Sequence, residues 1–294
     1  MNEDFRNNIP NTELILSTEE ASILAEELRK SLTAGKKPKD DINQIKKIIA
    51  GLGDSRGLLR RTFSESLGII GKKALPELKN ALLKSENVTV RRAAAKTLKL
   101  VGDPRALPYL FKALISDDDP VVQGSSVGAM VIFGEDAVGF LLEVLKNPAS
   151  TSLQCGLASW GLAFIGAEGS ELLKKGATSE SPKVRASVIA ALEDQLQKFN
   201  DLDARSIVKK GLCDSSEEVQ IESIKLAHLL DNQLTPHQIL DKLNHKNPEI
   251  RKQILFFIMK VKAKHQLNNL KKKLSEETEK NIIPIIKLAI NKLK

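Results

Sequence analysis

Residues 87–107 read NVTVRRAAAKTLKLVGDPRAL, and this stretch decides the fold. Its small and apolar residues recur at helical spacing and predict one buried helix face, made by Val90, Ala94, Thr97 and Leu98. Gly102 then follows as the glycine that ends a helix. Asp103-Pro104 supplies a capping carboxylate and a first-turn proline, so we expect a second helix directly after it.

This pattern recurs about every 31 residues along the chain. Each copy carries an apolar residue followed by Arg or Gln, at Leu59-Arg60, Val90-Arg91, Val122-Gln123, Val184-Arg185, Val219-Gln220 and Ile250-Arg251, with a degenerate copy at Leu153-Gln154. A glycine closes four copies, at Gly71, Gly102, Gly134 and Gly166, and a proline marks four junctions, at Pro120, Pro148, Pro182 and Pro248. Self-similarity at this period predicts an all-α solenoid of about seven two-helix repeats.

The pattern divides the chain into four predicted segments. Residues 1–16 lack periodicity, so we expect a flexible N-terminal arm there, followed by a pair of capping helices over residues 17–51. The repeats occupy residues 52–275. Residues 276–294 are expected to form a basic capping helix, in which Pro284 either delays the start or causes a kink.

Composition narrows the class of protein further. Aromatic residues make up 4% of the chain, which suits close helix packing better than a sandwich or barrel. Cys155 and Cys213 stand far apart and form no C-x-x-C motif, so a reducing compartment is expected rather than a disulfide framework or a zinc site. No stretch resembles a signal peptide or reaches the ~20 apolar residues of a membrane span. We therefore expect a cytoplasmic protein without membrane insertion.

The net charge of +8 is concentrated at one end of the chain. Residues 241–294 hold 14 Lys and Arg against 5 Asp and Glu, whereas the first 240 residues hold 31 against 32. A solenoid that binds nucleic acid would spread its positive charge along the groove, so nucleic acid is not an expected partner. The basic end has two interpretations: a solvated cap that keeps the last repeat soluble, or a docking surface for an acidic partner.

Motifs for hydrolysis and metal binding are weak in this chain. Residues 124–128 match the G-x-S-x-G nucleophile elbow, but they lie inside a predicted helix, with Ser126 in a packing position. The four histidines, His228, His237, His245 and His265, show none of the spacings that place two metal ligands on one helix face. No metal site is predicted, and the histidines are interpreted as surface or cap residues.

The arginines of the first two repeats form the main candidate binding site, at Arg56, Arg60, Arg61, Arg91 and Arg92. In a register of about 31 residues, Arg60 stacks over Arg91 and Arg61 over Arg92. One interpretation is a structural ladder, in which each junction aspartate pairs with a neighbouring arginine. The other is a row of guanidinium groups that binds carboxylates or phosphates, since bidentate contacts from arginine are strong and directional.

Trp160 is the only tryptophan and completes the list of candidate binding residues. It stands beside Gly161 in a helix of small residues. Two interpretations remain open: the indole fills a space in the core, or it forms a flat wall against a ligand.

The repeat motifs resemble the HEAT-like family of cyanobacterial phycobilin lyases and phycobilisome-degradation (non-bleaching) proteins. The resemblance rests on residues 87–94 and 102–108, with support from residues 119–122 and 181–185, and it covers about residues 52–260. Residues 157–166 look closest to the degradation-type members. The lyase subunits of the E type carry an aromatic-rich helix, whereas the matching segment here, residues 58–71, has only Phe63.

The resemblance implies a protein that handles phycobiliproteins or their open-chain tetrapyrrole, with a phycocyanobilin-type ligand bound transiently. The expected role is phycobilisome turnover or chromophore detachment. The alternatives are an E/F-type lyase subunit that works with a second HEAT-like chain and a scaffold without enzymatic activity. Either enzymatic role concerns the thioether between a client cysteine and the bilin. The arginines would then bind the propionates and Trp160 would lie against a pyrrole ring, while no catalytic residue is assigned.

Overall fold

The computed structural model describes residues 14–166, 170–230 and 239–294, and within these ranges the regular elements are helices. The chain divides into two units, Met1–Gly161 and Leu162–Lys294. The predicted all-α repeat fold is confirmed within each unit. None of the described helices is long and apolar enough to cross a bilayer.

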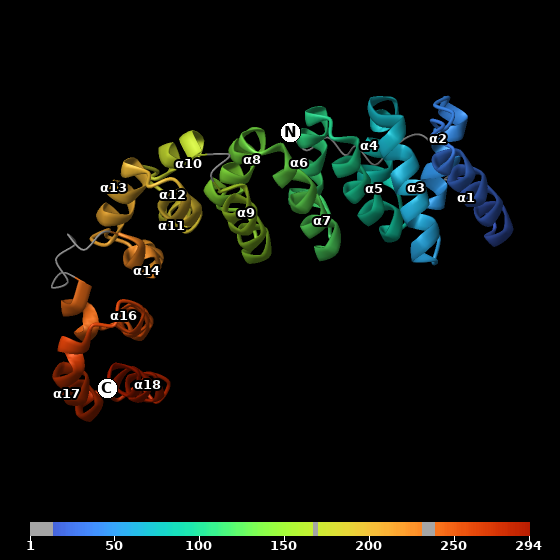
Figure 1. Cartoon of the computed structure of the whole chain (residues 1–294). Coiled ribbons are helices and arrows are strands. Elements are labelled where there is room, and N and C mark those ends of the chain that lie inside the picture. Colours follow the sequence, from blue (N-terminus) through green and yellow to red (C-terminus); the bar gives the residue numbers. More distant parts are fainter. Residues whose placement is uncertain (1–13, 167–169, 231–238) are drawn as a thin grey trace. The chain divides into compact units, whose positions relative to one another are not determined.

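In the first unit, successive helices alternate between two layers (Figure 1). One layer holds α1 (Thr18–Thr33), α3 (Gly57–Ile70), α5 (Val88–Val101), α7 (Pro120–Met130) and the start of α9 (Ser152–Ile165). The other layer holds α2 (Ile42–Gly51), α4 (Leu75–Lys84), α6 (Leu107–Ser116) and α8 (Glu135–Lys146). Helices from α1 to α8 contact their neighbours along the same layer, and α2, α4 and α6 also contact α3, α5 and α7 of the other layer.

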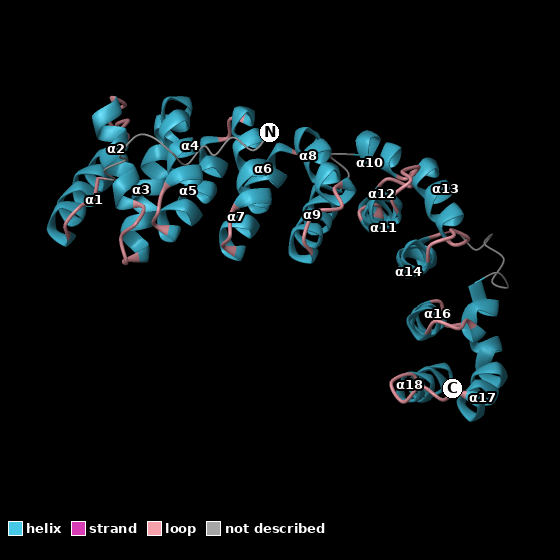
Figure 2. Ribbon diagram, turned by 180° about the vertical axis from the view of Figure 1, so that it is seen from behind, coloured by secondary structure: helices cyan, strands magenta, loops and turns pink. Residues whose placement is uncertain are grey.

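The second unit repeats this arrangement with shorter helices (Figure 2). One layer holds α11 (Pro182–Ala190), α14 (Glu217–Leu226), α16 (Pro248–Lys260) and α18 (Ile283–Leu293). The other holds α10 (Ser170–Gly176), α13 (Leu202–Gly211) and α17 (Leu267–Glu276), and the short α12 (Glu193–Lys198) precedes α13. The core of this unit includes Leu212, Ile254 and Ile286, each nearly inaccessible to solvent.

The turns within the repeats follow from glycine and aspartate, as the sequence predicts. Gly102 adopts a left-handed conformation with φ of 66° and ends α5, which a residue with a Cβ would do only with strain. Asp103 then caps a short 3₁₀ turn, Pro104–Ala106, so α6 begins at Leu107 rather than at the proline. Asp119 caps α7 by accepting hydrogen bonds from the N–H groups of Val121 and Val122.

The structure corrects the prediction for Pro148 and decides between the two alternatives for Pro284. Pro148 does not open a helix as the other three junction prolines do, because it lies in a turn and α9 begins at Ser152. Pro284 delays the last helix: α18 begins at Ile283 and runs without the kink that was the alternative. Residues 1–13 of the expected arm lie outside the described residues, and residues 14–17 precede α1 without regular structure.

Small residues in the middle of helices allow neighbouring helices to approach closely. Four such residues are fully buried: Ala94, Ser126, Ala158 and Ser223. The hydroxyls of Ser126 and Ser223 each donate to the carbonyl four residues earlier, so the helix itself satisfies them.

Candidate functional site

In six of the seven repeat motifs the Arg or Gln binds the chain segment that enters its own repeat, whereas Gln154 of the degenerate copy donates to the carbonyls of Leu114 and Ile115. Arg91, Arg185 and Arg251 each donate from Nη1 to the carbonyl oxygen six residues earlier, at 3.1, 2.8 and 2.9 Å. Gln123 and Gln220 make the same contact from Nε2, at 2.6 and 2.7 Å. These side chains therefore satisfy carbonyls in the junction between the preceding helix and their own helix.

The arginines of this set also reach forward to the next junction. Arg91 pairs with Asp117 at 2.7 Å, Arg185 with Asp214 at 2.8 Å, and Arg251 with Glu277 at 2.6 Å. Each pair joins one repeat to the next through two parallel hydrogen bonds. The geometry matches the ladder interpretation of the motif.

The other predicted arginines also have partners within the chain. Arg92 pairs with Asp119 at 2.6 Å. Arg56 pairs with Asp54 at 2.7 Å and donates to Ser22 and Thr18 of α1, so it ties the capping helices to the first repeat. Arg60 donates to the carbonyl of Asp54, and Arg61 pairs with Glu65 on the exposed side of α3. All five arginines thus have hydrogen-bond partners within the chain. Binding of propionates by these arginines stays a prediction.

Because the ladder aspartates are charged, we expect stability to depend on pH. The hydrogen bonds from Arg92 lower the pKa of Asp119 from its ordinary 3.8 to about 2. A pKa that is lower in the folded state adds stability above the unfolded value, and this stability is lost as pH falls through the folded value. The free energy of unfolding should therefore fall between about pH 4 and pH 2.

Asp119→Asn tests this, because asparagine keeps the helix cap and removes the charge. Urea titrations at a series of pH values should show a shallower acid-induced loss in the variant. The same slope in both proteins would contradict a role for the Asp119 charge.

Trp160 is about half exposed on α9, with 48% of its surface accessible. The core-filling interpretation is therefore wrong. The next residue, Gly161, packs against the core instead: a Cβ there would lie 2.9 Å from side-chain atoms of Leu141 and Val127. The indole remains a predicted ring contact.

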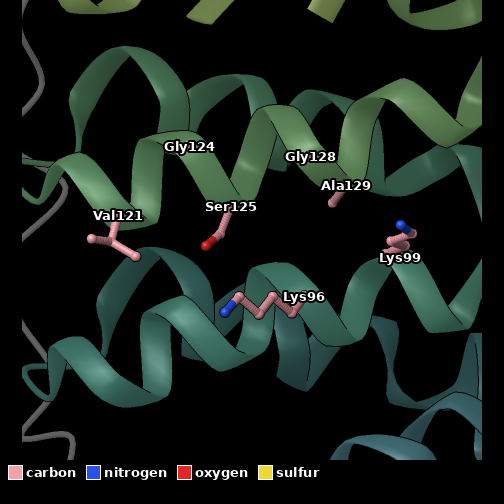
Figure 3. Close-up of a pocket in the computed structure, with 7 residues that line it drawn as sticks. All are labelled: Lys96, Lys99, Val121, Gly124, Ser125, Gly128 and Ala129. Atoms are coloured by element: carbon pink, nitrogen blue, oxygen red, sulfur yellow. The ribbon is translucent and has the colours of Figure 1, made fainter. Parts of the chain in front are cut away.

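A groove lies between α5 and α7 in the first unit (Figure 3). It encloses about 400 Å³. One wall is basic, with Lys96 and Lys99 on α5, and the other is uncharged and made of small residues on α7, namely Val121, Gly124, Ser125, Gly128 and Ala129. Figure 3 shows Lys96 and Ser125 facing one another across the groove.

The two walls of the groove differ in charge and in the size of their side chains. Helix α7 contains no charged residue, and Gly124 and Gly128 leave its outer face without large side chains. On α5 the two arginines are neutralised by Asp117 and Asp119, whereas neither Lys96 nor Lys99 has a carboxylate partner within the described ranges. The groove thus offers a flat, uncharged shelf beside two ammonium groups, which suits a planar ligand that carries carboxylates.

Sequence reasoning missed the two lysines and the groove beside them. The prediction that residues 124–128 lie inside a helix, with Ser126 in a packing position, is confirmed: they belong to α7 and the Ser126 side chain is buried. The available signal was the spacing: Gly124 and Gly128 lie one helical turn apart, as do Lys96 and Lys99. Among the described residues no group of three or more His, Cys, Asp or Glu is placed to hold a metal ion.

Comparison with known proteins places the chain in a family. The model of HEAT repeats matches residues 45–131 and residues 75–158. The bilin biosynthesis protein MpeU of Synechococcus sp. (strain WH8020) is 39% identical over 279 residues, which cover 95% of this chain and 94% of MpeU. The chain belongs to the HEAT-repeat family of MpeU.

Other similarities of this MpeU family member are more limited. The uncharacterized phycocyanin operon protein Z of Pseudanabaena tenuis (strain PCC 7409) is 36% identical over 132 residues, 41% of this chain and 65% of that protein. Among solved structures, YibA of E. coli has a TM-score of 0.45 at 18% identity and covers 96% of this chain and 98% of its own. The complex of CpcE and CpcF of phycocyanin lyase from Nostoc sp. PCC7120 has a TM-score of 0.32 at 19% identity, with 64% and 99% covered.

Proposed function

We propose that this chain binds an open-chain tetrapyrrole in the α5–α7 groove and presents it for attachment to a phycobiliprotein. The observation that carries the proposal is the match to a bilin biosynthesis protein along nearly the whole of both chains. A biosynthetic relative favours attachment over the detachment that the sequence resemblance implied. Pigment attachment would make the chain part of chromophore assembly rather than antenna turnover.

The geometry of the groove supports a tetrapyrrole as the ligand. A bilin has an extended conjugated body and two propionates. The small residues of α7 allow the conjugated body to approach the helix closely, and Lys96 and Lys99 lie on one face of α5 where they can bind the propionates. Trp160, on the helix after α7 and α8, is proposed as a ring contact.

The chemistry in this proposal requires positioning more than a nucleophile from this chain. The client's cysteine supplies the sulfur, which bonds to the vinyl or ethylidene carbon of the bilin, and the thiol proton ends on the tetrapyrrole skeleton. This addition consumes no oxidant or reductant. The chain would hold the reacting carbon beside the thiol and exclude water, since fixed orientation accelerates such bimolecular steps.

The decisive test is coexpression of the chain with a phycobiliprotein apo-subunit and a bilin supply. We expect a covalent adduct, seen as bilin fluorescence that survives a denaturing gel. Charge reversal in Lys96→Glu/Lys99→Glu should weaken bilin binding about tenfold or more, measured by absorbance titration, because the ligand's carboxylates would then face like charges. The helical circular dichroism should stay unchanged.

Lys46→Glu/Lys47→Glu is the matched control, because it makes the same change of charge on exposed residues of α2, in the other layer. This control should retain both binding and adduct formation. Loss of bilin from a holoprotein, with no gain on the apo-subunit, would overturn attachment in favour of turnover. If a second HEAT-repeat chain is required, the adduct should form only when both chains are present.

A further inference from the structure

A second groove lies in the second unit, where residues of α14, α16 and α18 line it, and the proposed function does not use it. It encloses about 360 Å³. Its floor is apolar, with Phe256 and Met259 of α16, and Phe256 is 38% exposed. Its rim is basic, with Lys225, Lys260 and Lys292. An apolar floor with a cationic rim is suited to an anionic partner with an apolar anchor.

Hydrogen bonds to His228 fix the position of one ammonium group on this rim. His228 Nδ1 lies 2.9 Å from the carbonyl oxygen of Lys225, and its Nε2 lies 3.0 Å from Lys260 Nζ. The carbonyl can only accept and the ammonium can only donate, so the imidazole is neutral, with its proton on Nδ1. Burial and the charge of Lys260 lower the pKa of His228, which agrees with this tautomer. Lys260 is thereby oriented and keeps two N–H groups for a further acceptor.

Two of the three lysines on the rim are not neutralised. Lys225 pairs with Glu222 at 2.7 Å. For the part of the chain that is described, Lys260 and Lys292 have no carboxylate partner. Both also belong to the basic segment 241–294, which holds 14 Lys and Arg against 5 Asp and Glu. The surroundings of the groove therefore attract a macromolecular anion over a distance of about a Debye length.

We propose that this groove docks an acidic segment of a partner protein, with a large apolar side chain of that segment on Phe256 and Met259 and its carboxylates on Lys260 and Lys292. Charge complementarity favours such a partner over a neutral ligand, because the positive charge extends well beyond the groove. The site is separate from the α5–α7 groove, so the two proposals can fail independently. This docking surface would bring the client to the chain while the pigment occupies the first unit.

Calorimetric titration of the full chain with a short peptide tests this, using a peptide in which aspartates and glutamates surround one phenylalanine. We expect binding that weakens as salt is raised. Lys260→Glu/Lys292→Glu should weaken it about tenfold. The matched variant Lys271→Glu/Lys287→Glu changes the same charge on exposed residues outside the groove and should weaken it much less. A peptide with serine in place of the phenylalanine should also bind about tenfold more weakly.

Equal losses in the two double variants would mean diffuse attraction to the basic end and would overturn the docking groove. Equal affinity for the phenylalanine and serine peptides would overturn the apolar anchor. A third outcome is that the groove binds free phycocyanobilin but not the peptide, and that Lys260→Glu/Lys292→Glu abolishes the binding of phycocyanobilin. The groove would then be a small-molecule site, and the proposal would be overturned. Formation of the covalent bilin adduct is measured separately for each variant, so that failure of the docking groove can be distinguished from failure of bilin attachment.

Discussion

Replacing Arg251 by alanine should lower the free energy of unfolding of the second unit by about 3–5 kcal/mol. Arg251 and Glu277 are almost completely buried, with 8% and 2% of their side-chain surfaces exposed, and they form two hydrogen bonds of 2.9 and 2.6 Å. Arg251 also donates to the carbonyls of His245 and Lys246. The substitution would leave two carbonyls without this donor, and it would leave the buried carboxylate with only the N–H of Glu279 and the ammonium group of Lys273, 3.5 Å away.

The expected cause is the loss of two charge-assisted hydrogen bonds to the buried carboxylate of Glu277. Burial raises the pKa of this carboxyl, and the hydrogen bonds from Arg251, with help from the N–H of Glu279 and the charge of Lys273, more than offset that rise and lower it. Without Arg251 the destabilising effect of burial on the carboxylate remains. Urea unfolding, together with hydrogen exchange over α16–α18, would measure the loss.

Two control variants separate this cause from a general loss of arginine. Arg61→Ala removes an exposed pair with Glu65, four residues away on α3, and should change the free energy of unfolding very little, because water screens the pair. Arg251→Met/Glu277→Leu replaces the buried pair by apolar groups and should recover part of the stability, because it removes the buried carboxylate, while Lys273, whose side chain is 14% exposed, loses its partner. Similar losses for Arg251→Ala and Arg61→Ala would contradict the ladder as a stabilising element.

The repeat architecture could be predicted from the sequence because its signals are local. Gly102, Asp103 and Asp119 each fix a turn through their own backbone or a side chain within a few residues. The course of the chain around Pro148 could not be predicted, since proline fixes only its own φ and is compatible with a turn as well as with the first turn of a helix.

The candidate site was less predictable because it depends on which side chains are already paired. Arg91 and Arg92 read as binding residues until the positions of Asp117 and Asp119, one junction later, are known. Lys96 lies on the same helix and is also basic, but it has no carboxylate partner in the described structure. No local sequence pattern shows which of these basic residues is paired. Trp160 illustrates the same limit, because exposure is set by how α9 packs and not by residue type.

A second large loss of stability is expected at Phe63, the largest fully buried side chain of the first unit. Its ring lies against Gly51 at the end of α2: a Cβ on Gly51 would be 2.5 Å from Cε2 and 2.7 Å from Cζ of the ring. Phe63→Ala removes the ring and leaves a cavity, which should cost about 3–5 kcal/mol. Gly51→Ala alone should cost about 1–3 kcal/mol, because the buried ring has to shift.

The double variant Gly51→Ala/Phe63→Ala should be more stable than Phe63→Ala alone. With the ring gone, the methyl group introduced by Gly51→Ala meets no clash and fills part of the cavity, and alanine is favoured over glycine in a helix by up to about 1 kcal/mol. The same Gly51→Ala change is thus expected to have opposite signs in the two backgrounds, which is the non-additivity of residues in direct contact. Urea unfolding of the four proteins completes the cycle. Additive losses would show that Gly51 is not required for close approach of the ring, and that the capping helices and the first repeat adjust to one another without strain.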